Sequence, residues 1–76
     1  MTTTIQLTTE FIPLAALLKL AGAAESGGHA KQMVIAGRVS VNGETNTRRS
    51  SKIRPGDVVK VAGDAAGTTP VLIEVC

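Results

Sequence analysis

Apolar residues recur in two different patterns along the first third of the chain. Residues 4–8 alternate between polar and apolar side chains, which predicts a short edge strand. From Ile12 onward the apolar positions recur every three or four residues, the spacing of an amphipathic helix, at Leu14, Leu17, Leu18 and Ala21. Pro13 suits the first turn of that helix, and Gly22 is well placed to end it. The pattern therefore predicts a strand followed by a helix.

A second helix is predicted from Ser26 to about Ala36. Ser26 stands at the N-cap position, Gly27 and Gly28 open the first turn, and Gly37 follows the last one. One side of this helix is apolar and is expected to pack against the core through Ala30, Met33 and Val34. The opposite side of the helix is free to face a ligand and carries Gly28, Lys31, Gln32, Ile35 and Arg38.

The second half of the chain is predicted to form short strands separated by turns. Residues 39–41 predict a strand with both valines inward. Asn42-Gly43 favours a tight hairpin turn, because both central residues of a type I′ turn have positive φ, and residues 45–47 are expected to form the returning strand.

The remaining segments continue this pattern. Ile53 is expected to point inward, and Pro55-Gly56 fits the central pair of a type II turn. Residues 58–61 predict a strand with Val59 and Val61 on one face. Residues 63–70 predict a loop of small residues, and residues 71–75 a last strand that pairs near the N-terminal one.

Length and composition limit what the protein can be. A chain of 76 residues buries only about 60% of its unfolded surface, so residues 1–76 are expected to form a single domain. Cys76 is the only cysteine, which excludes an internal disulfide, and one thiol with one histidine cannot form a metal site. No signal peptide is recognised, and no apolar run approaches the roughly 20 residues of a membrane helix. We expect a soluble, cytoplasmic protein with no membrane partner.

Positive charge is concentrated in the middle of the chain. All eight Lys and Arg residues lie between Lys19 and Lys60, together with three acidic residues, so this stretch carries a charge of +5. Such a surface suits a polyanion. Because Phe11 is the only aromatic residue, a nucleic acid would have to be recognised by charge, hydrogen bonds and shape rather than by stacking on several rings.

The start of the second helix has properties that suit phosphate. Ser26-Gly27-Gly28 leaves backbone N–H groups open at the positive end of the helix dipole, and Lys31 follows one turn later. If the hairpin folds back beside this helix, a basic groove forms whose opposite wall is built from Arg48, Arg49 and Lys52. Taken alone, a Ser-Gly-Gly start is more often a simple cap, and a run of charges is more often a solvated loop.

No pattern in the chain points to catalysis. The six carboxylates are scattered, and neither a nucleophile-elbow pattern nor a phosphate-binding glycine loop is present. His29 has no second histidine or acidic residue at metal-binding spacing and is more often a surface residue in such a setting. We therefore expect no enzyme, no cofactor, no metal and no small-molecule substrate.

The order of these elements resembles a known family. Ser26-Gly27-Gly28-His29-Ala30-Lys31 is followed by Gly37-Arg38-Val39-Ser40-Val41-Asn42-Gly43, by Arg48-Arg49 and by the segment from Lys52 to Val59 with its Pro-Gly-Asp turn. This order resembles the alpha-L RNA-binding domain first described in small-subunit ribosomal protein four, over about residues 11–63. The chain is most similar to small free-standing bacterial members, which share the Ser-Gly-Gly helix start.

The resemblance implies both a fold and a function. The fold is α+β, with two short helices packed on a small, strongly bent, mainly antiparallel sheet. The family binds structured RNA along the second helix and the following hairpin, which implies RNA-facing roles for Ser26, Lys31, Arg38, Arg48, Arg49 and Lys52. The pattern of the second helix adds Gly27, Gly28 and Gln32 to the candidate RNA-binding residues. Many members carry a basic residue directly after the helix-start serine, whereas this chain has Gly27, which removes one phosphate contact but exposes more backbone N–H.

Two hypotheses of different classes follow. The first is an RNA-binding module that recognises structured RNA, either ribosomal RNA or a tRNA-like RNA, by shape and phosphate contacts, as a ribosome-associated monomer. The second is a protein-interaction module that docks an acidic partner through its basic face or associates with itself through Phe11, Ile35 or the last strand. The apolar strand at residues 71–75 is the candidate edge for such self-association.

Overall fold

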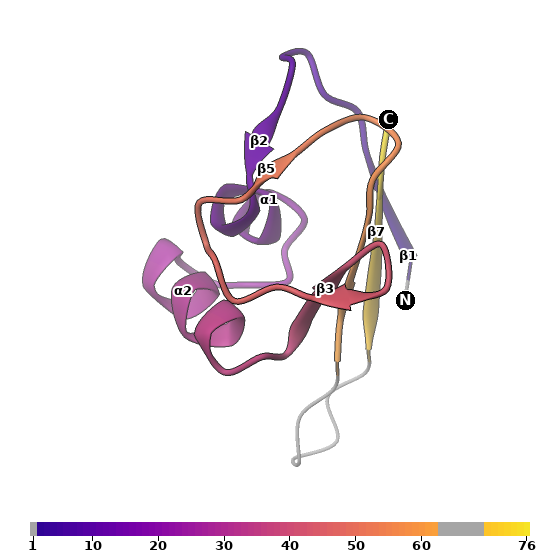
Figure 1. Ribbon diagram of the computed structural model, residues 1–76. Coiled ribbons are helices and arrows are strands. Elements are labelled where there is room, and N and C mark those ends of the chain that lie inside the picture. The colour runs from indigo at the N-terminus through magenta and orange to yellow at the C-terminus, as the bar shows by residue number, and fades with distance from the viewer. Residues whose placement is uncertain (1, 63–69) are drawn as a thin grey trace.

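Both helices lie on one side of a five-stranded sheet in the computed structural model, which describes residues 2–62 and 70–76 (Figure 1). The helices are α1 (Leu14–Leu20) and α2 (Gly27–Ile35). The strands are β1 (Thr2–Ile5), β2 (Ile12–Pro13), β3 (Val39–Val41), β4 (Glu44–Thr45), β5 (Lys52–Ile53), β6 (Val58–Val61) and β7 (Val71–Val75). The α+β class implied by the family resemblance is confirmed.

The main sheet has the strand order β1-β7-β6-β3-β4. β6 pairs antiparallel with β7 on one side and with β3 on the other, and β3 forms an antiparallel hairpin with β4. β1 pairs with β7 in parallel, with Thr2 opposite Leu72 and Ile5 opposite Val75. β2 and β5 form a separate antiparallel pair, which lies next to α1.

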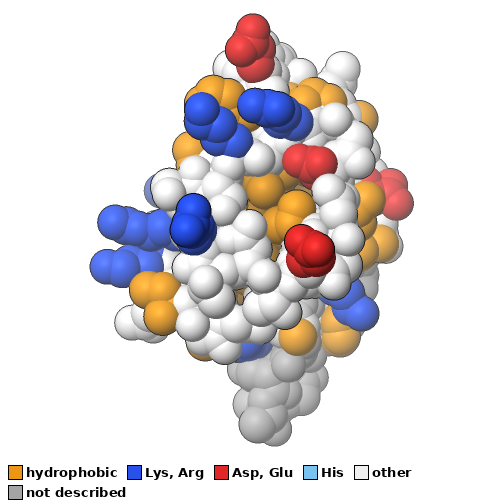
Figure 2. All heavy atoms as spheres, in the orientation of Figure 1, with side chains coloured by type: hydrophobic (Ala, Val, Ile, Leu, Met, Phe, Trp, Pro, Cys, Tyr) orange, Lys and Arg blue, Asp and Glu red, His pale blue; other side chains and the backbone are white. Residues whose placement is uncertain are grey.

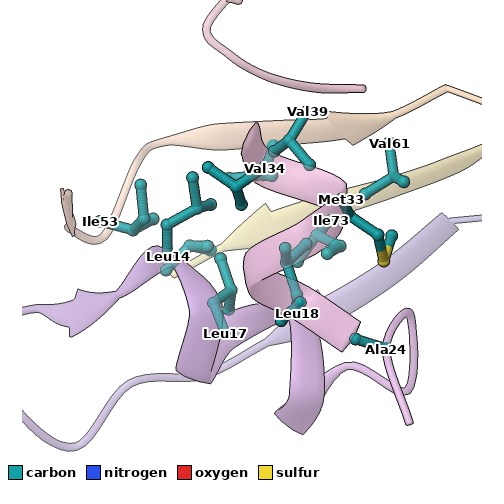
Figure 3. Close-up of a cluster of buried hydrophobic side chains, with 13 residues drawn as sticks. Leu14, Leu17, Leu18, Ala24, Met33, Val34, Val39, Ile53, Val61 and Ile73 are labelled. Carbon is teal, nitrogen blue, oxygen red and sulfur yellow. The ribbon is translucent and has the colours of Figure 1, made fainter. Parts of the chain in front are cut away.

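The core lies between the helices and the sheet. Alternation along β6 turns Val59 and Val61 toward the helices and leaves Val58 and Lys60 on the exposed side. Figure 3 shows side chains from both helices and from the strands in one cluster. Its fully buried large members are Leu14, Leu17, Leu18, Val34, Val39, Ile53, Val59 and Ile73. Each stabilises the fold by roughly 1.5 to 3 kcal/mol through the transfer of its side chain out of water.

The predicted helix ends agree with the structure except at one residue. Ser26 caps α2, and its Oγ accepts a hydrogen bond from the His29 N–H. Gly22 and Gly37 follow the two helices with φ of 77°, a left-handed conformation that favours glycine. Pro13, predicted in the first turn of α1, is instead its N-cap, with ψ of 143°. Its backbone is extended because it belongs to β2, where it pairs with Lys52.

Three predictions about the strands need correction. The N-terminal edge strand covers Thr2–Ile5 rather than residues 4–8, because its partner β7 ends at Val75. The returning strand of the hairpin is Glu44–Thr45 rather than residues 45–47. The Asn46 N–H still donates to the Val39 carbonyl at 2.9 Å, but its side chain already accepts from the Arg48 N–H in the next turn. β7 lies between β1 and β6, so the expectation that residues 71–75 provide an edge for self-association is wrong.

Other predicted features are confirmed or lie outside the described residues. Asn42 and Gly43 have φ of 52° and 88°, as the predicted hairpin turn requires. Of the predicted loop at residues 63–70, only Pro70 is described, and it is exposed. Within residues 2–62 and 70–76, neither helix has the length and apolar character needed to cross a bilayer.

Candidate nucleic-acid interface

The first turn of α2 offers open backbone N–H groups. The first intrahelical hydrogen bond runs from the Ala30 N–H to the Ser26 carbonyl at 3.0 Å, and the Ser26 Oγ accepts from the His29 N–H at 3.1 Å. The N–H groups of Gly27 and Gly28 precede these bonds, so helix geometry provides them with no acceptor inside the helix. Both glycines are exposed, and an anion could therefore approach these two N–H groups at the positive end of the helix dipole.

Neither glycine is required there by the fold itself. A Cβ added at Gly27 would meet no atom within 4 Å, and one added at Gly28 would lie 3.9 Å from the Ser26 Oγ, an ordinary contact. Neither residue has a positive φ. An alanine would therefore fit, and what glycine adds at these positions is a backbone that is not covered by side chains.

Lys31, Gln32 and Arg38 differ in how free their side chains are. Lys31 and Gln32 are exposed on α2. Arg38 is half-buried after the helix, and its Nη2 donates to the Ala62 carbonyl at 3.2 Å. Its backbone also joins Ala62, whose N–H donates to the Arg38 carbonyl at 2.8 Å. Arg38 thus ties the end of α2 to the segment after β6, and part of its hydrogen-bonding capacity serves the fold.

The segment 46–51, which we call the basic loop, is anchored on α1. The Leu14 N–H donates to the Ser51 carbonyl at 2.9 Å, and the Ala15 N–H donates to the Arg49 carbonyl at 3.0 Å. These N–H groups open α1, which has no side-chain cap, so the loop backbone supplies acceptors that the helix start lacks. The side chains of Arg48 and Arg49 are exposed. The loop therefore holds two cations at a fixed place beside α1.

Asn46 shapes the basic loop from inside. Its Oδ1 accepts hydrogen bonds from the Arg48 N–H at 2.8 Å and from the Ser51 Oγ at 3.0 Å. The first of these bonds is the local turn that Asn side chains commonly make with the backbone two residues on. The sequence pattern predicted a strand at Asn46 and did not reveal this role, although the tendency of Asn to form such local turns is a signal that could have pointed to it.

Acidic residues in the part of the chain that the structure describes form no ion pairs with the cations of this region. Within the described residues, Lys31, Arg48 and Arg49 take part in no ion pair, and Lys52 lies with its Nζ 4.9 Å from the centre of the Phe11 ring. Figure 2 shows Lys and Arg side chains on the left and upper parts of this face, with Asp and Glu side chains at the top and toward the right. Unpaired charges of one sign produce a field that attracts an anion.

The residues at the start of α2 and those of the basic loop are connected indirectly, through α1. The hydrogen bonds of the basic loop go to α1, and α1 packs against α2. Leu17 and Leu18 of α1 and Ala30 and Val34 of α2 belong to the same buried cluster. The helix start and the basic loop are therefore held at a fixed separation by a common core. No three His, Cys, Asp or Glu side chains gather at metal-binding distance within residues 2–62 and 70–76.

Comparison with known proteins gives consistent matches. The family model described as "S4 domain" matches residues 5–68. A Bacillus subtilis (strain 168) protein named "Probable ribosome maturation protein RlbA" is 44% identical over 59 residues, which cover 78% of this chain and 83% of the relative. An Escherichia coli (strain K12) protein named "Putative RNA-binding protein YbcJ" is 44% identical over 52 residues, 68% of this chain and 74% of the relative. None of these names describes an enzyme.

Proposed function

This chain belongs to the S4 domain family, and we propose that it is an RNA-binding protein that recognises structured RNA by phosphate contacts and shape. The observation that carries the proposal is the set of unpaired cations on two elements that share one core, next to an open helix start. The family and the names of its relatives agree with a binding protein rather than an enzyme.

In the proposed complex the start of α2 and the basic loop each bind phosphates of the RNA. The N–H groups of Gly27 and Gly28 with Lys31 bind at the start of α2, and Arg48 and Arg49 bind from the basic loop. A groove between them would be completed by Gln32, Arg38 and Lys52. Because a common core fixes their separation, an RNA whose phosphates match that separation binds best, and this is how a rigid protein reads RNA shape without reading bases.

Ribosomal RNA is the proposed target. The B. subtilis relative is named as a ribosome maturation protein, and the E. coli relative is named as an RNA-binding protein. We propose that this chain acts as a monomer on ribosomal RNA in the cytoplasm, with a tRNA-like RNA as the alternative target.

A titration against two RNAs tests the proposal. The purified protein is titrated by fluorescence anisotropy against a folded ribosomal RNA fragment and an unstructured strand of equal length, at three salt concentrations. If four to six phosphates are engaged, log affinity should fall against log salt with a slope of roughly −3 to −5, given about 0.7 to 0.9 per neutralised phosphate. Tighter binding to the folded RNA is expected. No binding to either RNA at low salt would overturn the proposal.

A further inference from the structure

The small sheet of β2 and β5 has one buried face and one exposed face. Ile12 pairs with Ile53, and Pro13 pairs with Lys52. Ile53 is buried and Ile12 is half-buried, so the alternation of an antiparallel pair turns their neighbours in the sequence to the outside. One further step of this register brings Phe11 opposite Arg54, and both residues are exposed.

Phe11 is the only aromatic residue of the chain, and it is not part of the core. Its side chain is 38% exposed. The Nζ of Lys52 lies 4.9 Å from the centre of the ring, within the range of a cation–π interaction. Single exposed apolar residues are common on proteins, but this ring has two cations on the neighbouring strand. Lys52 places its Nζ over the ring, and the extended register puts the backbone of Arg54 opposite that of Phe11.

This exposed face continues the basic loop. Lys52 directly follows Ser51, whose carbonyl accepts from the Leu14 N–H, so the loop and the strand are fixed to the same end of α1. Asp57 Oδ2 accepts from the Arg54 N–H at 2.8 Å and holds the backbone of Arg54 in place on the other side. An RNA bound at the basic loop would therefore pass next to the Phe11 ring.

We propose that Phe11 stacks on one unpaired nucleobase of the bound RNA, while Lys52 and Arg54 bind the phosphates on either side of it. Aromatic rings of proteins stack on bases in this way, and nearby cations hold the backbone. The inference rests on the proposed function and extends it, because it specifies an RNA in which a helical part is joined to a bulged or single-stranded nucleotide. The single ring limits the site to one base.

Two RNA hairpins of identical stems test this inference, one with a single bulged adenosine and one fully paired. The wild-type protein and Phe11→Leu are titrated against both by fluorescence anisotropy. Loss of one base–aromatic stack weakens binding by roughly 5-fold to 150-fold, so wild type should prefer the bulged RNA by at least about 5-fold and Phe11→Leu should lose that preference. Binding of the fully paired RNA should be unchanged, because the phosphate contacts remain.

A matched variant controls for the loss of an exposed apolar side chain. Leu20 is 61% exposed on α1 and lies outside the proposed site, so Leu20→Ala should keep the preference for the bulged RNA. Equal binding of wild type to both RNAs, or an undiminished preference in Phe11→Leu, would overturn the stacking site. If neither RNA binds, the proposed function itself fails, whereas binding without any preference refutes only the stacking site.

A spectroscopic measurement provides a second test. The chain contains no tryptophan, so Phe11→Trp introduces a single fluorophore at the site, and a base stacked on it should quench its emission. Quenching by the bulged hairpin but not by the paired one is the expected result, with the circular dichroism spectrum confirming that the variant is folded. Emission that stays unchanged when the bulged RNA is fully bound would contradict the proposal.

Discussion

At the scale of single residues, Asn42 and Asp57 join two turns that are far apart in the sequence. The Asn42 Nδ2 donates to Asp57 Oδ1 at 3.1 Å, and the Asn42 Oδ1 accepts from the Val58 N–H at 2.9 Å. Asp57 Oδ2 accepts in addition from the Arg54 N–H at 2.8 Å. The sequence assigns each residue only to its own turn. In the fold the two side chains form one unit, which fixes the backbone of Arg54 next to the proposed stacking site.

This unit leads to a prediction for stability. Asp57→Ala removes the acceptor of two hydrogen bonds and should lower the free energy of unfolding by about 1 to 3 kcal/mol. Asn42→Ala should also destabilise, and the double variant should lose less than the two single losses together, because each change breaks the same bond. Urea unfolding followed by circular dichroism measures all three variants. Strictly additive losses would show that the two turns are not coupled.

At the scale of elements, the parallel pairing of β1 with β7 determines which backbone groups of β1 are free. The Cys76 N–H donates to the Ile5 carbonyl at 2.9 Å, and the Leu7 N–H donates to the Cys76 carbonyl at 2.8 Å. Backbone groups alternate in direction along a strand, so Thr3 faces β7 as Ile5 does. Thr4 and its N–H face the open edge of the sheet.

Proline substitutions distinguish these two directions. Thr3→Pro removes a donor to β7 and should lower the free energy of unfolding by about 1 to 3 kcal/mol. Thr4→Pro is its matched control, since proline is tolerated where the missing N–H faced solvent, and its cost should stay below about 1 kcal/mol. The unfolding midpoints in urea provide the comparison. A larger loss for Thr4→Pro than for Thr3→Pro would contradict the observed pairing.

At the scale of the whole molecule, the two faces of the sheet are chemically different. Helices cover one face, and the basic loop and α2 carry exposed cations on that side of the molecule. Lys60 lies on the other face, because its neighbours Val59 and Val61 point into the core. The net charge of +2 does not show where a polyanion would bind. The positions of the cations on the surface decide this, because they set the local field.

This arrangement yields a prediction for RNA binding. The double variant Arg48→Ala with Arg49→Ala should flatten the salt slope of RNA affinity by about 1 to 2, because up to two phosphate contacts are lost. The fold should be unaffected, since only exposed side chains are removed and the loop backbone keeps its bonds to α1. Lys60→Ala removes one cation from the opposite face and should leave the slope unchanged. Equal slopes for wild type and the double variant would remove both arginines from the site.

The sequence by itself determined the local elements of this protein. Ser26 marks the start of α2 because its side chain satisfies a neighbouring N–H, and Asn42-Gly43 marks the hairpin because its backbone conformation is local. The alternation of valines identified the buried face of β6. The order of these signals was enough to recognise the family and to select the nine candidate RNA-binding residues, because each signal depends on residues that are close in the chain.

Only the tertiary structure decided how distant segments meet. The pairing of residues 71–75 with the N-terminal strand was predicted from the sequence, but the structure made that pairing parallel and put β7 inside the sheet. It paired β2 with β5 and fixed the basic loop to the start of α1. The fold also brought Lys52 next to Phe11. From the composition, Phe11 is only the single aromatic residue and Lys52 only one of eight cations, so their contact could not be foreseen. These contacts depend on which strands become neighbours, and packing of the common core sets that choice rather than the conformational preference of any short segment.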